Sequence, residues 1–279
     1  MKAIALDLDH TLLNSDNKIS EENITALQVA HEQNVCLIVA TGRMPQAVTR
    51  IIGESKELFS YFVCYNGALV LRSSDSTTCY EECVNYSDMR FLTDKFDLRN
   101  HNVVLFSNDS IFATTTIDDK VVDHYKKRTG ATFEYRSDLT KLDCRNFHKF
   151  FVYPLEISNN YNPHTESPLE DTVYKQALEF NSNRLKIIKT RLGYIECTSP
   201  FVSKWDSMIH ALKSEGLTQK KIMAIGDGYN DIEMVEKSHF GVAVDNAVPE
   251  LKAVAKHIVG SNNDSGVAEA IYHFLELTH

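Results

Sequence analysis

Two carboxylates follow the first apolar segment of the chain at a spacing that suits chemistry on phosphorus. Residues 3–6 run directly into Asp7, and Asp9 comes after a single leucine. Side chains alternate between the two faces of an extended chain, so both carboxylates turn to the same side. One of them can attack a phosphate ester as a nucleophile while the other moves a proton.

Three further apolar segments stop at residues that a phosphoryl group could use. They end at Thr41, at Lys204 and at the run from Asp227 to Asp231. The anionic oxygens of a phosphomonoester repel an incoming nucleophile, so a catalyst must place cations and hydrogen-bond donors around phosphorus. Together the four segments predict an enzyme that acts on phosphate esters.

Each motif taken alone has a simpler structural explanation. The Asp7 segment could be a turn that caps a helix. Thr41 could be a helix cap as well, and Lys204 could be a surface lysine. Four independent turns would have no reason to coincide with strand ends in this order, so a shared site is the favoured hypothesis.

Some residues near these segments keep two interpretations. Arg43 could brace an acidic side chain or contact a substrate, and Asn66, which precedes a glycine, most simply serves a tight turn. The run from Asp227 could be a calcium-type turn, although Ser238 stands where that turn has its last carboxylate ligand.

Alternating strands and helices must position these residues. In the first part, Ser20 provides an N-cap for a helix, and the apolar runs at residues 35–40 and 61–65 are typical of buried strands. The same alternation returns near Lys204, with a helix at 206–213, strands at 222–225, 240–244 and 257–259, and a helix at 266–274. This pattern predicts a parallel sheet covered by helices, with a site beyond the carboxyl ends of its strands.

The segment between these two parts has a different pattern. Residues 103–106 and 111–114, joined through Asn108-Asp109, resemble an antiparallel hairpin rather than a crossover unit. A helix at 118–129, a strand at 150–153, a polar loop at 158–167, a helix at 170–180 and strands at 185–188 and 194–197 complete it. We therefore expect an α/β protein with a doubly wound, mostly parallel sheet (residues 1–82 and 190–279) and an inserted α+β domain (residues 83–189).

Composition limits the partners and the compartment. The length of 279 residues suggests two domains or one elaborated domain, and the net charge of −9 argues against nucleic acid, whose partners present a basic face. No apolar run is long enough to cross a bilayer, so no membrane contact is expected.

The six cysteines are scattered and indicate reduced thiols of a cytoplasmic protein. Cys79 and Cys83 could suit a metal, but structural thiols are favoured. We expect a monomer or a weak homo-oligomer.

In this order the four segments resemble the motifs of the haloacid dehalogenase superfamily. The motifs are Asp7-Leu8-Asp9-His10-Thr11-Leu12, Thr41-Gly42-Arg43, Ser203-Lys204 and Gly226-Asp227-Gly228-Tyr229-Asn230-Asp231. The chain is most similar to the Cof-type phosphatases of subfamily IIB, whose α/β cap domain is inserted between the second and third motifs. The resemblance covers nearly the whole length and implies a Rossmann-like core.

The resemblance also implies a role for each motif. Asp7 would be the nucleophile that forms an aspartyl-phosphate, and Asp9 would serve as acid and then as base. Mg²⁺ would be bound by the side chains of Asp7 and Asp227 and by the main-chain carbonyl of Asp9. Lys204 would offset the charge of the phosphoryl oxygens.

Other motif residues would surround the metal and the substrate. Asp231 would support Lys204 or belong to the metal site with its water shell. The candidate substrate-binding residues are Thr41, Gly42, Arg43, Asn66 and Asn230.

The implied function is Mg²⁺-dependent hydrolysis of small soluble phosphomonoesters, with sugar phosphates as the leading class and the cap domain closing over the leaving group. Two alternatives stay open: a phosphosugar mutase of a related family, and a non-catalytic protein that binds a phosphorylated metabolite. Two residues depart from the family pattern, because His10 and Trp205 each stand where glycine is usual. Both could reshape access to the site.

Overall fold

The computed structural model describes residues 2–89, 101–107, 110–114, 117, 119–136, 147–154, 184–189, 195–213 and 222–276. The chain divides into two compact units. The first comprises Met1–Arg43, Val48–Glu81 and Ser203–His279, and the second comprises Met44–Ala47 and Glu82–Val202.

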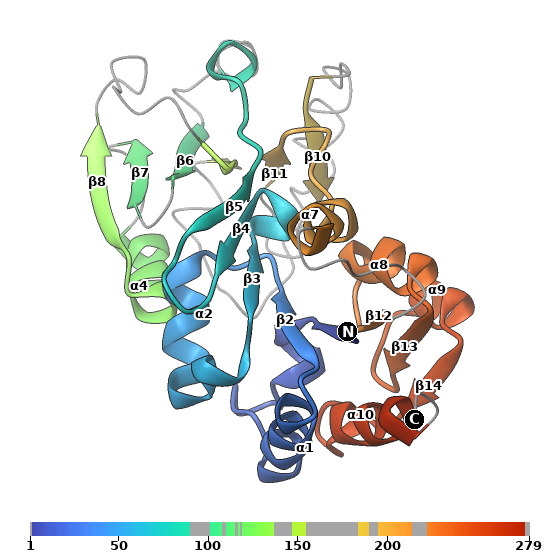
Figure 1. The fold of residues 1–279 in the computed structure, drawn as a ribbon. Coiled ribbons are helices and arrows are strands. Elements are labelled where there is room, and N and C mark those ends of the chain that lie inside the picture. The colour runs from blue at the N-terminus through green and yellow to red at the C-terminus, as the bar shows by residue number, and fades with distance from the viewer. Residues whose placement is uncertain are drawn as a thin grey trace. The chain divides into compact units, whose positions relative to one another are not determined.

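The first unit is built on a mostly parallel sheet. Among the described residues its eight strands lie in the order β14-β13-β12-β1-β2-β3-β4-β5 (Figure 1). Neighbouring strands from β14 to β3 are parallel, and β4 and β5 extend the sheet antiparallel at one edge. The strands are β1 Ala3–Leu6, β2 Cys36–Ala40, β3 Tyr61–Cys64, β4 Leu69–Arg72, β5 Thr78–Glu81, β12 Ile222–Gly226, β13 Phe240–Val244 and β14 His257–Val259.

Burial explains the composition of the central strands. Every residue of β1, β2, β12 and β13 is buried, and none of these strands alternates between apolar and polar residues. Continuous apolar strands are typical of a parallel sheet that is covered on both faces. The predicted α/β class is confirmed, and so are the strands predicted at 35–40, 61–65, 222–225, 240–244 and 257–259. Strands β4 and β5 were not predicted; Arg72 at the end of β4 is exposed, as are the first and last residues of β5.

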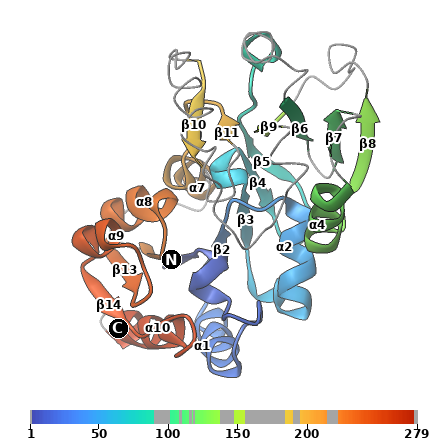
Figure 2. The same cartoon turned by 180° about the vertical axis from the view of Figure 1, so that it is seen from behind.

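Helices cover this sheet in contacting groups. Figures 1 and 2 show α1 and α10 side by side; α1 also packs on β2, and α10 packs on β13 and β14. In another group α8 contacts α7 and α9 and packs on β12 and β13. The helices of these groups are α1 Glu21–Glu32, α7 Lys204–Leu212, α8 Ile232–Lys237, α9 Pro249–Val254 and α10 Gly266–Glu276; helix α2, Pro45–Ile52, follows β2 along the chain.

Serine side chains fix the starts of two of these helices. The Oγ of Ser20 accepts a hydrogen bond from the amide of Asn23, as the N-cap prediction requires. The Oγ of Ser203 accepts one from the amide of Asp206, so α7 begins at Lys204 and not at Asp206 as predicted. This earlier start places Lys204 at the first helical position.

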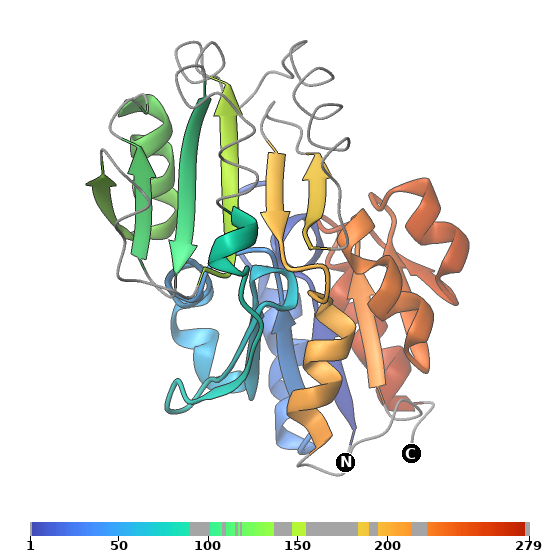
Figure 3. The same cartoon turned by 90° about the horizontal axis from the view of Figure 1, so that it is seen from above.

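The second unit contains a separate sheet. In the part of this unit that the structure describes, six strands lie in the order β10-β11-β9-β6-β7-β8 and are antiparallel, except that β7 and β8 are parallel. Helix α4, Asp119–Thr129, connects the parallel pair and stands beside the green strands in Figure 3. The strands are β6 His101–Ser107, β7 Ser110–Thr114, β8 Thr132–Arg136, β9 Lys149–Pro154, β10 Lys186–Lys189 and β11 Ile195–Thr198.

The two faces of the second sheet carry different apolar clusters. Val103, Leu105 and Phe150 belong to a buried core on one face. On the other, the ring of Phe106 contacts the rings of Phe151 and of Tyr125 from α4. The antiparallel pairing of β6 with β7 confirms the predicted hairpin.

The second boundary of the insert differs from the expected one. It was expected between residues 189 and 190, but β11 pairs with β10 and β9, so this sheet extends to Thr198. The predicted loop at 158–167, the predicted helix at 170–180 and the Asn108-Asp109 turn lie outside the described residues.

A close backbone approach joins the turn after β3 to the start of α7. Gly67 has φ 108°. A Cβ at this position would lie 2.2 Å from the carbonyl oxygen of Ser203. Only glycine fits both the left-handed backbone and the contact. This approach sets the start of α7, and with it the base of Lys204, against the sheet.

The substitution Gly67→Ala tests this contact. It should lower the free energy of unfolding by about 2 kcal/mol or more, because backbone strain and the clash with Ser203 add. Gly53→Ala is the matched control, since Gly53 also has a positive φ of 54° but no neighbour within 4 Å. The free energy of unfolding of that control should fall by only about 1 kcal/mol, which is the cost of a left-handed backbone. Urea unfolding measures both, and equal losses would contradict the close approach.

Candidate active site

The four sequence motifs meet at one edge of the first unit's sheet. Asp7, Thr41 and Asp227 directly follow β1, β2 and β12, which are neighbours in the sheet. The amide of Asp7 donates to the carbonyl of Ile225 at 3.1 Å, which extends the β1–β12 pairing up to the carboxylate. The carboxyl ends of parallel strands are where sites of open α/β sheets form.

Lys204 joins two of the aspartates. Its Nζ donates to Oδ1 of Asp7 at 2.6 Å and to Oδ1 of Asp231 at 2.7 Å. Lys204 is 3% exposed, Asp7 4% and Asp231 1%. Burial by itself would lower the pKa of Lys204, but attraction to Asp231 and Asp7 outweighs it and raises that pKa. The ammonium is therefore held charged between two carboxylates.

Asp231 also orders the loop that carries Asp227. Its Oδ2 accepts hydrogen bonds from the amides of Asp227 at 3.2 Å and Gly228 at 3.0 Å. Its Oδ1 is bound to Lys204. Of the two roles expected for Asp231, the structure shows the support of Lys204.

The carboxylates of Asp7, Asp227 and Asp231 form a compact cluster, with one oxygen from each lying within 4.8 Å of the others. Burial raises the pKa of Asp7 well above its usual range, against the attraction of Lys204. Burial and the repulsion of Asp231 raise the pKa of Asp227 to about 6, although the Thr11 hydroxyl donates to its Oδ1 at 3.2 Å.

One ammonium therefore does not balance this cluster. Buried carboxylates that lack sufficient positive charge favour a bound cation, and a set of oxygen ligands suits a hard divalent ion. The donor set fits the metal site that the sequence analysis expected. Thr11, which orients Asp227, was not among the predicted site residues.

Arg43 holds the second aspartate of the first motif. Its Nε donates to Oδ2 of Asp9 at 2.8 Å and its Nη2 donates to Oδ1 at 2.5 Å. Such a two-point contact fixes the orientation of a carboxylate as well as its position. Arg43 was predicted among the substrate-binding residues, and here it braces Asp9. The bracing interpretation is the one that the structure shows.

The other predicted substrate-binding residues lie together beside Thr41. The amide of Asn66 donates to the carbonyl of Thr41 at 2.9 Å, and Nδ2 of Asn230 donates to Oδ1 of Asn66 at 3.0 Å. Gly42 faces the Asn66 amide group, 3.1 Å from where its Cβ would be. The Thr41 hydroxyl accepts from the amide of Arg43 at 3.2 Å.

The two residues that depart from the family pattern, His10 and Trp205, lie in different environments. Trp205 is 2% exposed, so its side chain packs in the interior. His10 is exposed and has a left-handed backbone with φ 60° and ψ 12°. Glycine adopts this left-handed backbone without strain, which explains why the family pattern has glycine at this position.

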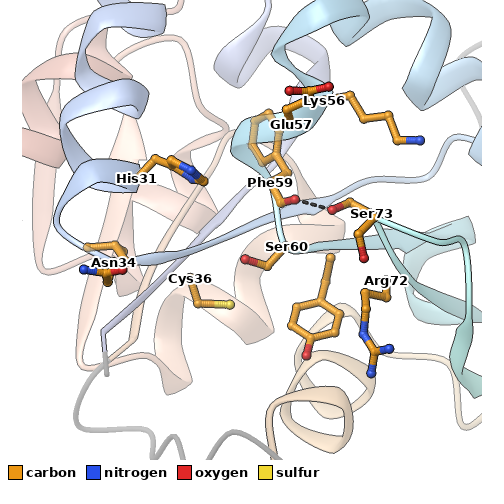
Figure 4. A pocket seen from close by; sticks show the side chains of 12 residues that line it. His31, Asn34, Cys36, Lys56, Glu57, Phe59, Ser60, Arg72 and Ser73 are labelled. Carbon is orange, nitrogen blue, oxygen red and sulfur yellow. Dashed lines mark hydrogen bonds between the residues drawn. The ribbon is translucent and has the colours of Figure 1, made fainter.

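A cavity of about 740 Å³ lies elsewhere in the first unit. Cys36 and Tyr61, the first residues of β2 and β3, line it, so it sits at the strand ends opposite to the carboxylate cluster. In Figure 4 the cationic ends of Lys56 and Arg72 extend in different directions and do not converge on one point. The cavity is therefore separate from the predicted chemistry.

In the described part of the chain, no helix combines the length and the apolar character that a membrane span needs.

The chain belongs to the haloacid dehalogenase-like hydrolases, whose family model matches residues 4–271. A Streptococcus pyogenes protein, M6_Spy0533, whose name assigns it to the phosphatases, is 31% identical over 277 residues, which are 97% of either chain. The 5-amino-6-(5-phospho-D-ribitylamino)uracil phosphatase YcsE of Bacillus subtilis is 28% identical and covers 99% of this chain and 96% of its own. The chain is thus a hydrolase of the phosphatase type.

The fold has a solved counterpart within the same superfamily. A sugar phosphatase of subclass IIB superimposes with a TM-score of 0.79 at 18% identity, and the match covers 98% of this chain and 99% of the other. The fold expected of a Cof-type protein is therefore confirmed.

The pKa of Asp227 predicts how the stability of the metal-free protein changes with pH. A carboxyl whose pKa rises from about 4 to about 6 on folding binds its proton more tightly in the native state. Stability should therefore fall as the pH rises between these two values. In the presence of a chelator, Asp227→Asn should raise the melting temperature at about pH 7.5 by a few degrees, and much less at about pH 4.5.

Asp245→Asn provides a control at a nearby carboxylate that is largely exposed, with 70% of its side chain accessible. Scanning calorimetry at the two pH values should show little change for this variant. A metal-free Asp227→Asn protein that melts below the wild type at the higher pH would contradict the assignment of charge repulsion to this site.

Proposed function

We propose that this protein hydrolyses small phosphomonoesters by transferring the phosphoryl group first to Asp7 and then to water. The observation that carries the proposal is the buried contact of 2.6 Å between Lys204 Nζ and Asp7 within a cluster of three carboxylates. Such a cluster places a nucleophile and positive charge at one point, as displacement at phosphorus requires.

In the first half-reaction a carboxylate oxygen of Asp7 attacks phosphorus. The bond from phosphorus to the ester oxygen breaks, and Asp9 gives its proton to the departing alkoxide. Arg43 holds the Asp9 carboxyl through two hydrogen bonds during this transfer. Lys204 offsets the charge on the phosphoryl oxygens as the new bond forms.

In the second half-reaction Asp9 acts as a base. It removes a proton from a water molecule, whose oxygen attacks the phosphorus of the aspartyl-phosphate. The bond from phosphorus to the Asp7 oxygen breaks, and inorganic phosphate and the free carboxylate are released. The same residue thus serves as acid and then as base, which restores the starting protonation state.

A divalent cation fits the carboxylate cluster, and Mg²⁺ is the ion that we propose. The side chains of Asp7 and Asp227 would hold it, with the main-chain carbonyl of Asp9. Asp231, whose two oxygens already accept hydrogen bonds, would act beside it. When bound, Mg²⁺ supplies positive charge against the phosphoryl oxygens.

The residues beside Thr41 would contact the phosphoryl group. The Thr41 hydroxyl, the Gly42 amide and the paired side chains of Asn66 and Asn230 gather next to Asp7's strand, at the end of β2 and β3. Neutral donors of this kind position a phosphoryl group without adding charge.

The substrate class that we favour is a phosphorylated sugar or polyol. The named substrate of the Bacillus subtilis relative carries a phosphate on a ribityl chain, and the subclass IIB structure is that of a sugar phosphatase. We place the enzyme in the cytoplasm, because all five cysteines in the described part of the chain are free thiols.

An artificial aryl phosphate tests the reaction without knowledge of the natural substrate. The wild type should release phosphate with Mg²⁺ and stop when a chelator is added. Asp7→Asn should lower the rate about a thousandfold or more, because it removes the nucleophile, while the fold stays intact. Asp16→Asn, at an exposed aspartate of the following loop, is the control and should keep the wild-type rate.

Acid-quenched turnover with labelled phosphate distinguishes the alternatives. The label should appear on the peptide that contains Asp7 in the wild type and be absent in Asp7→Asn. A mutase would release phosphate slowly and depend on a bisphosphate activator, and a binding protein would release none. Undiminished hydrolysis by Asp7→Asn would reject the proposal.

A further inference from the structure

The loop that carries both catalytic carboxylates contains a strained residue at its centre. His10 lies between Asp9 and Thr11 and has φ 60° and ψ 12°. A left-handed backbone costs free energy for any residue with a Cβ, so the conformation persists only where the surroundings hold it. The loop must therefore be held by contacts from outside it.

Asn246 provides such a contact from a distant part of the chain. It follows β13, and its Nδ2 donates to the carbonyl oxygen of His10 at 2.8 Å. The hydrogen bond joins residues that are 236 positions apart. It fixes the carbonyl of the strained residue, and so the direction in which the chain leaves Asp9.

Asn262, which follows β14, links this contact to the end of the same loop. Its amide donates to Oδ1 of Asn246 at 2.9 Å, and its Nδ2 donates to the carbonyl oxygen of Leu13 at 2.9 Å. Asn262 is 5% exposed, so its hydrogen bonds have little competition from water. The two asparagines form a bracket, which we define as Asn246 and Asn262 with the carbonyls of His10 and Leu13.

We propose that Asn246, anchored by Asn262, is a positioning residue for the phosphatase reaction: it holds His10 in the left-handed conformation and thereby fixes Asp9 relative to Asp7. The inference rests on the proposed roles of these two aspartates. In the described part of the chain neither asparagine forms a hydrogen bond with the carboxylate cluster, so both act through the loop backbone. In chains with glycine at the His10 position the same turn needs less support, because glycine adopts it without strain.

A thermodynamic cycle tests the bracket with Asn246→Ala, His10→Gly and the double variant. Asn246→Ala alone should lower kcat about tenfold with KM changed less than about twofold, because the loop loses one well-placed hydrogen bond and misplaces Asp9. In the His10→Gly background, Asn246→Ala should lower kcat about twofold or less. His10→Gly alone should keep kcat within about twofold of the wild type.

Amide hydrogen exchange provides a readout that does not depend on activity. The amides of Leu12 and Leu13 donate to the carbonyls of Asp7 and Leu8 and close the loop. Their exchange should be about tenfold faster in Asn246→Ala, and close to the wild type in the double variant. A role in overall stability alone would change exchange throughout the unit instead.

Asn263→Ala is the matched control. Asn263 is the neighbouring asparagine, and its Oδ1 accepts from the amide of Ser15, beyond the end of the bracketed loop. This variant should keep kcat and the exchange of the Leu12 and Leu13 amides. The bracket is overturned if Asn246→Ala keeps wild-type kcat. It is also overturned if Asn246→Ala lowers kcat by the same factor in the wild-type and the His10→Gly backgrounds. Failure of the proposed function would differ, because the wild type would then release no phosphate.

Discussion

One buried ammonium is the constraint on which the site depends. Lys204, at the first position of α7, stands between Asp7 at the end of β1 and Asp231 after β12, and all three side chains are buried. Removing such charges from water costs several kcal/mol per ion, so they are tolerable only when geometry pairs them closely. The close approach of Gly67 to Ser203 and the Ser203 cap set the helix start that makes this pairing possible.

The negative charge of the same cluster is not fully neutralised by Lys204, and this bears on the function of the site. Three carboxylates face one lysine, and burial raises the pKa values of Asp7 and Asp227. Carboxylates that are incompletely neutralised favour a bound cation, because the cation would relieve their mutual repulsion. Arg43 pairs with Asp9 through two hydrogen bonds and so fixes the orientation of this second carboxyl.

The sequence predicted what local patterns determine. The continuous apolar runs predicted the central strands, and polar residues at their ends predicted which side chains would meet. The start of α7 was predicted two residues too late, although Ser203, followed three residues later by Asp206, carries a common N-cap signal. Contacts between distant residues were beyond reach: nothing local indicates that Arg43 pairs with Asp9, or that Asn246 bonds to His10 across 236 positions.

Unfolding of Lys204→Met in urea tests the central constraint most directly. Losing the ammonium should cost about 3–5 kcal/mol at about pH 7.5, because two buried carboxylates are left without their partner. The loss should shrink at about pH 5, because burial raises the pKa of Asp7 and protonation removes its unpaired charge. Lys237→Met, at an exposed ion pair with Glu233, should cost less than about 1 kcal/mol at either pH. Equal, pH-independent losses for the two variants would contradict the account.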